Sequence, residues 1–134
     1  MILDAGFLIS VDRSEADART FLAAADRRST VLRTTEPVVA QVWRGGGRQA
    51  RLATFLESAE ILPLDDGRFV GRLLAASKTT DVVDAHLVAV ALRFADDVLT
   101  GDVDDLTVIT SPLGPSAPVV HRWPPPSGVR TLSH

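Results

Sequence analysis

Residues 79–105 read TTDVVDAHLVAVALRFADDVLTGDVDD and place two groups of aspartates on either side of an almost wholly apolar segment. The segment is apolar nearly all round, which predicts a helix that is buried on more than one side. The flanking acids are Asp81, Asp84, Asp102, Asp104 and Asp105. Crowded carboxylates raise one another's pKa unless a cation lies between them, so this stretch predicts one wall of a divalent-metal pocket.

Short apolar segments elsewhere in the chain predict the strands that accompany this helix. We expect strands at 1–3, 30–35, 61–64 and 97–100, a helical turn at 7–11, and helices at 15–27, 36–44, 48–59, 65–77 and from Asp81 onward. Helices that alternate with short strands predict an α/β fold with a mainly parallel sheet.

Chain length and proline content predict one domain followed by a distinct segment. The chain has 134 residues, the size of a single domain, and we assign residues 1–110 to it. Six of the eight prolines lie beyond residue 110. In the segment 111–134, residues 119–123 could add a last edge strand, and an extended, polyproline-like tail is expected after it.

Composition excludes several classes of function. The chain has no cysteine, which rules out disulfides, thiolate zinc sites and a cysteine nucleophile. No run approaches the roughly 20 apolar residues of a membrane span, and the N-terminus lacks the pattern of a signal peptide, so we expect a cytoplasmic protein without membrane contact. The net charge of -3 argues against a purely electrostatic nucleic-acid binder.

Three of the acids are expected to meet at one edge of the sheet. Asp4 and Asp102 each follow a predicted strand, and Asp84 lies in the first turn of the helix that leads into the second of these strands. Ligands of parallel α/β sheets bind outside the carboxyl ends of the strands, so the three carboxylates converge there if the strands are neighbours. Oxygen-only ligands suit Mg²⁺ or Mn²⁺, which can activate water and stabilise the leaving oxygen of a phosphodiester.

Each acid also has a simpler structural explanation. Asp81 fits a helix N-cap, and Asp84 fits an acid that faces the positive end of a helix dipole. Asp102, Asp104 and Asp105 fit an exposed turn after a strand. The combination of acids at strand ends, rather than any one of them, favours the metal site.

Basic residues are concentrated in the middle of the chain. Arg44, Arg48 and Arg51 stand at helical spacing and are candidates for a phosphate-binding rim, although without further context a solvated helix face is the stronger explanation. Trp43 is predicted to be a core anchor rather than a base-stacking platform. His86 is predicted to be a packed or capping histidine rather than a metal ligand.

Four stretches together resemble a known family. ILDAGFLI at the N-terminus, VVAQVWRGGGRQARL, DVVDAHLVAVA and VLTGDVDDL occur in the order and spacing of the PIN-domain ribonucleases, among them the VapC-type toxins of bacterial toxin–antitoxin pairs. The resemblance implies a three-layer α/β/α sandwich with about four or five strands. It also implies a Mg²⁺- or Mn²⁺-dependent endoribonuclease, a homodimer, and a small antitoxin whose C-terminal segment enters the acidic groove.

The resemblance assigns roles to individual residues. The family's acids that bind metal and catalyse cleavage fall at Asp4, Asp84 and Asp102, and some members have further acids where Asp81 and Asp104 stand. A glutamate of the family pattern falls at Gln41, whose amide can bind weakly through oxygen but brings no charge.

Two other hypotheses remain beside the ribonuclease. Because Gln41 replaces an acid, the chain could be an inert PIN-like domain that binds protein or RNA. A phospho-acceptor receiver domain also gathers aspartates at strand ends, but it needs a lysine at the end of a late strand. The single lysine, Lys78, precedes the Asp81 helix instead.

Overall fold

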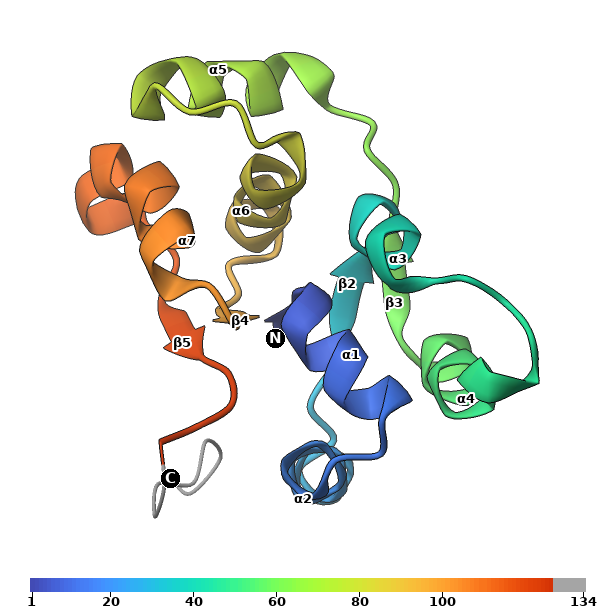
Figure 1. Ribbon diagram of the computed structural model, residues 1–134. Coiled ribbons are helices and arrows are strands. Elements are labelled where there is room, and N and C mark those ends of the chain that lie inside the picture. The colour runs from blue at the N-terminus through green and yellow to red at the C-terminus, as the bar shows by residue number, and fades with distance from the viewer. Residues whose placement is uncertain (127–134) are drawn as a thin grey trace.

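The computed structural model describes residues 1–126 and contains a five-stranded, all-parallel sheet with the strand order β3-β2-β1-β4-β5 (Figure 1). The strands are short: β1 Ile2–Leu3, β2 Arg33–Thr35, β3 Glu60–Leu62, β4 Val98–Thr100 and β5 Val120–Arg122. The central strand β1 pairs with β2 on one side and β4 on the other. The predicted α/β class is confirmed, and the strands that precede Asp4 and Asp102 are neighbours.

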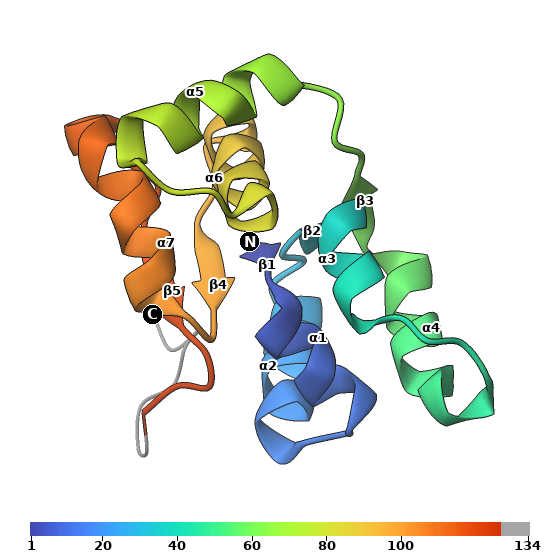
Figure 2. The same ribbon diagram turned by 45° about the horizontal axis from the view of Figure 1, so that its top comes forward.

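Seven α-helices connect the strands within residues 1–126: α1 Ala5–Asp12, α2 Ala16–Arg27, α3 Glu36–Val42, α4 Ala50–Ser58, α5 Gly67–Ser77, α6 Val82–Phe94 and α7 Val103–Thr110. The chain runs outward from β1 through β2 to β3, then returns across the sheet to β4 and β5. Right-handed crossovers in these two directions put α1–α4 on one face and α5–α7 on the other. Figure 2 shows α5 and α6 gathered on the side of the sheet away from α1 and α2.

Three helical segments differ from the sequence-based expectation. The predicted turn at 7–11 is the full helix α1, and the helix expected from residue 48 starts with the 3-10 turn η1, Gly47–Gln49, before α4 begins. Residues 103–110, for which an exposed turn was an alternative, form α7. The burial of Leu106 and Ile109, three residues apart on one helical face, explains why this segment is helical.

The core beneath α1 is organised around Trp123, not Trp43. The Trp123 ring packs edge-to-face on Phe7 at 4.8 Å between ring centroids and on Phe21 at 5.7 Å, and its indole N–H donates to Ser10 Oγ at 2.9 Å. Trp123 is 3% exposed, whereas Trp43 is 39% exposed. The prediction that Trp43 is a core anchor is therefore wrong, and the buried tryptophan is the one that follows β5.

The helix α6 has the burial that its sequence predicts. Seven of its residues are buried, and the helix contacts β1, β2 and β4. His86 is one of the buried residues and donates from Nε2 to the Pro63 carbonyl at 3.2 Å, while its burial lowers its pKa. It is a packed histidine, as expected. Among residues 1–126, none of the helices is both long and apolar enough to span a bilayer.

Candidate active site

Three helices begin at the carboxyl edge of the sheet, and an aspartate caps each of them. Asp4 precedes α1, Asp81 precedes α6 and Asp102 precedes α7. Each carboxylate accepts a hydrogen bond from a backbone N–H of its own helix, at 2.9 Å, 3.0 Å and 3.5 Å respectively. The positive ends of three helix dipoles thus face one group of carboxylates.

Asp4 is held rigidly at this edge. It is 8% exposed, and its Oδ1 accepts from Gly6 N–H at 2.9 Å. Its Oδ2 accepts from Gly101 N–H at 3.1 Å and from the Thr100 hydroxyl. Burial raises the pKa of Asp4, and the hydrogen bonds from Thr100, Gly101 and Gly6 oppose that rise. The fold therefore fixes the position of this carboxyl group.

Thr100 and two glycines connect Asp4 to Asp102. The Thr100 hydroxyl donates to Asp4 Oδ2 and accepts from the Asp102 N–H at 2.9 Å. A Cβ on Gly6 would lie 3.3 Å from Asp4 Oδ1 and 3.5 Å from Gly101 Cα. Glycine at this position leaves the space in which the two chain segments approach each other closely.

Asp84 stands in a different electrostatic environment. Its pKa is raised to about 7, first by burial and then by the negative charges of Asp81, Asp102, Asp105 and Asp4. No residue in the described part of the chain donates a hydrogen bond to its carboxylate. Asp105 also has a raised pKa, first because of its side-chain contact with Asp102. The crowded acids of the sequence are thus crowded in space.

A family model described as PIN domain matches residues 1–109. The chain belongs to the PIN domain family. PIN domains are commonly metal-dependent nucleases, which supports the expectation of nuclease chemistry at the level of the family. No curated protein gives a significant match.

The predicted site residues fall into two groups in this PIN domain. Asp4, Asp81, Asp84 and Asp102 come together with Asp105, which the sequence placed in the wall of the predicted metal pocket but not among its ligands. The sequence could have placed Asp105 beside Asp102, because it lies three residues after this N-cap and therefore in the first turn of the helix. Asp104 is exposed on α7 and Gln41 is exposed on α3, and no described contact joins Gln41 to the carboxylates.

Three of these carboxylates, but neither Asp4 nor Asp102, border a small hollow. A pocket of about 340 Å³ is lined by Thr79, Thr80, Asp81, Asp84, Asp105, Val108 and Ile109. This set offers only oxygen ligands, which fits the preference of Mg²⁺ and Mn²⁺. Within residues 1–126, no three histidine, aspartate or glutamate side chains stand close enough together to hold a metal ion as they are placed.

The candidate RNA-backbone residues lie on the surface. Arg44, Arg48 and Arg51 are exposed, and none of them pairs with a carboxylate in the part of the chain that the structure describes. The Arg44 guanidinium donates instead to the Trp43 carbonyl at 2.7 Å and the Ala40 carbonyl at 3.3 Å. No acid within residues 1–126 therefore neutralises their charges.

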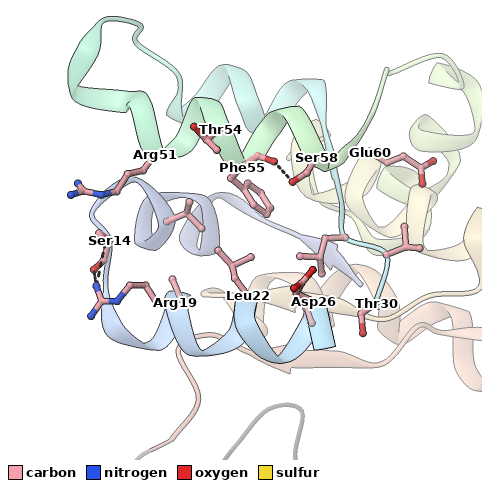
Figure 3. Close-up of a pocket in the computed structure, with 15 residues that line it drawn as sticks. Ser14, Arg19, Leu22, Asp26, Thr30, Arg51, Thr54, Phe55, Ser58 and Glu60 are labelled. Carbon is pink, nitrogen blue, oxygen red and sulfur yellow. Dashed lines mark hydrogen bonds between the residues drawn. The ribbon is translucent and has the colours of Figure 1, made fainter. Parts of the chain in front are cut away.

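A larger hollow lies between α2 and α4, away from the carboxylates (Figure 3). It has a volume of about 730 Å³, and Leu22 and Phe55 point into it. Figure 3 shows Arg19 and Arg51 at one end, with acids at the other, Asp26 and Glu60. This groove shares no residue with the acidic pocket.

Proposed function

We propose that this PIN domain is a Mg²⁺- or Mn²⁺-dependent endoribonuclease that hydrolyses RNA phosphodiesters as the toxin of a type II toxin–antitoxin pair. The observation that carries the proposal is the gathering of carboxylates around Asp84, whose pKa is raised to about 7 first by burial and then by these neighbouring charges. Crowding of this kind costs folding free energy and is typical of functional sites. A divalent cation would offset that cost.

Asp4, Asp84 and Asp102 are the residues that would hold the ion. When bound, the ion supplies activation of water and neutralisation of the charge that develops on the scissile phosphate. The fixed position of Asp4 sets one side of the site, through the Thr100 hydroxyl and two backbone N–H groups. Asp81, Asp104 and Gln41 are secondary candidates, and the three arginines described above would steer the RNA backbone.

Cleavage of single-stranded RNA by the purified protein tests this proposal. Wild-type protein is expected to cleave in Mn²⁺ and not in EDTA, and Asp4→Asn should lose at least about 100-fold of the rate. Asp17→Asn, on the exposed first turn of α2, is the matched control and should retain activity. Expression of wild type, but not of Asp4→Asn, should inhibit growth. A folded Asp4→Asn variant that still cleaves RNA and remains toxic would refute the metal-site assignment.

The second candidate function is an inert PIN domain that binds protein or RNA, and Gln41 is the residue that favours it. Replacing Gln41 with glutamate supplies the charge that the family pattern has at this position. If Gln41→Glu creates Mn²⁺-dependent cleavage that wild type lacks, the natural chain is a binding domain. If wild type already cleaves, the ribonuclease stands.

The proposed partners are a small antitoxin and a second copy of the chain, both in the cytoplasm. The toxin assignment predicts that an adjoining reading frame encodes a small protein with a DNA-binding start and a C-terminal arm. Co-expression of that protein should restore growth and yield a complex. A toxic chain without such a neighbour would favour a stand-alone nuclease.

A further inference from the structure

The segment between α3 and α4 projects from the molecule and carries an exposed aromatic side chain. Figures 1 and 2 both show this segment as a wide loop on the outside of the fold. Trp43 ends α3 and is 39% exposed. Among the described residues nothing accepts a hydrogen bond from its indole N–H, whereas the corresponding group of Trp123 bonds to Ser10. Part of the Trp43 ring is therefore open to solvent, and its N–H has no acceptor among residues 1–126.

The conformation of this exposed loop is fixed by hydrogen bonds to a buried glutamine. Gln49 is 7% exposed, and its Oε1 accepts from the N–H groups of Arg44 at 2.7 Å and Gly45 at 2.9 Å. Its Nε2 donates to the Val42 carbonyl at 3.0 Å. All three partners flank Trp43 in the sequence, so Gln49 sets the direction of the chain on both sides of the ring.

The glycines leave the outer side of the loop open. Gly45 and Gly46 have φ angles of +84° and +85°, which L side chains rarely adopt. A Cβ at Gly46 or Gly47 would meet no atom within 4 Å, and a Cβ at Gly45 would meet only the Trp43 indole nitrogen, at 3.8 Å. Because glycine has no side chain, these three positions add no atoms that could cover the Trp43 ring.

Two arginines lie close to Trp43 in the sequence. Arg44 follows Trp43 directly, and Arg48 lies in the same loop. Neither is neutralised by an acid within residues 1–126. An exposed aromatic ring with arginines that no acid neutralises can bind single-stranded nucleic acid, because a base stacks on the ring while the cations contact the phosphates.

The loop is also tied to the helix that starts at the acidic site. Gln49 Nε2 lies 3.5 Å from Asp12 Oδ2, at the last residue of α1. Asp4 caps the first turn of that helix, and eight helical residues span about 12 Å. The acidic pocket repels phosphates in the absence of a cation, so affinity for RNA has to come from residues outside it.

We propose that Trp43 is a stacking platform for an unpaired base of single-stranded RNA, with Arg44 and Arg48 contacting the adjacent phosphates. The inference rests on the proposed function for the identity of the ligand as RNA. It concerns binding rather than cleavage, so the two can fail separately. It also predicts a preference for single strands, because a paired base does not expose its face to the ring.

Binding is measured with a fluorescein-labelled single-stranded RNA of mixed sequence, in EDTA and in the Asp4→Asn background so that the probe stays intact. Trp43→Ala should weaken binding about tenfold, within the range seen when a stacking aromatic is truncated. Leu64→Ala is the matched control, since Leu64 is an exposed loop residue of similar exposure at 42%. The same RNA as a duplex should bind equally to both variants.

The second measurement uses the fact that the chain has only two tryptophans. Single-stranded RNA should quench the emission of the Asp4→Asn protein, and Trp43→Phe, which leaves only the buried Trp123, should abolish the quenching. Trp43→Ala affinity within twofold of the parent, or undiminished quenching in Trp43→Phe, overturns the proposal. A change in oligomeric state with unchanged RNA affinity also overturns it and assigns the ring to a protein interface.

The two assays also separate this inference from the proposed function. If the wild-type protein cleaves RNA and Trp43→Ala binds it normally, only the stacking platform is refuted. If Trp43 is required for binding but no metal supports cleavage, the platform stands and the chain is an RNA-binding PIN domain.

Discussion

Asp4 and Asp84 lie at the same edge of the sheet, but their carboxyl groups differ in hydrogen bonding and in electrostatic environment. Asp4 accepts hydrogen bonds from one hydroxyl and two backbone N–H groups. Asp84 accepts none from the described residues, and four neighbouring acids raise its pKa after burial does. Asp4 is therefore part of the architecture of the edge. The environment of Asp84 disfavours its charge, as expected for a group that functions with a cation.

Thr100→Val should disrupt the hydrogen bonds that hold Asp4 and have the largest effect on stability. The substitution removes the hydroxyl that donates to Asp4 and accepts from the Asp102 N–H. The Asp4 carboxylate keeps its hydrogen bonds from Gly101 and Gly6 but loses one donor, and the Asp102 N–H loses its acceptor. Losing these two hydrogen bonds should cost about 2–3 kcal/mol of unfolding free energy, measured by urea denaturation.

Thr34→Val is the control for this effect. Thr34 is also buried, on the neighbouring strand β2, and its hydroxyl makes one hydrogen bond, to the Leu3 carbonyl at 2.8 Å. Its loss should cost about 1 kcal/mol and leave RNA cleavage unchanged, while Thr100→Val lowers cleavage. Equal losses of activity in the two variants would show that Thr100 has no special link to the site.

Mn²⁺ should stabilise the folded wild-type protein, because the Asp84 carboxylate helps to bind the ion. A ligand that binds only the folded state at about ten times its Kd adds about 1.4 kcal/mol to the unfolding free energy. Asp84→Asn should lose this response in a thermal melt, and Asp17→Asn should keep it. An identical response in wild type and Asp84→Asn would place the ion elsewhere.

The contrast between these two acids also shows how far the sequence can predict the site. The strand-end positions of Asp4 and Asp102 follow from local patterns, because a short apolar run followed by aspartate predicts where each strand stops. The sequence left open whether the two strands are neighbours, and the pairing of β1 with β4 in the structure shows that they are. The partners of Asp4 could not be found in this way, since Thr100 and Gly101 lie 96 and 97 residues away along the chain.

The two tryptophans show the same limit in the core. Local sequence made Trp43 a reasonable core residue, because it follows the apolar helix α3. The space near Phe7 is filled instead by Trp123, which arrives from the far end of the chain as β5 joins β4. Contact between Phe7 and a residue from the far end of the chain depends on the topology of the whole fold, which local sequence does not reveal. Helix α7 could be predicted from local sequence, because it begins at a capping aspartate and its buried residues recur at helical spacing.

Asp84→Asn should give the smallest effect, with its sign set by pH. The folded-state pKa of Asp84 is about 7 against 3.8 for the model carboxyl group. Its protonated form therefore stabilises the fold fully below about pH 4, and this contribution is lost as pH rises toward about 7.

In EDTA at about pH 8, asparagine avoids a crowded charge, so Asp84→Asn should be about 1 kcal/mol more stable than wild type after allowance for solvent screening. At about pH 4 the two proteins should have nearly equal stability, because the wild-type side chain is then protonated in the folded state. Urea denaturation at both pH values measures the difference, with Asp17→Asn as the exposed control. If Asp84→Asn is less stable than wild type at the higher pH, the Asp84 carboxylate has a stabilising partner, and the contrast with Asp4 does not hold.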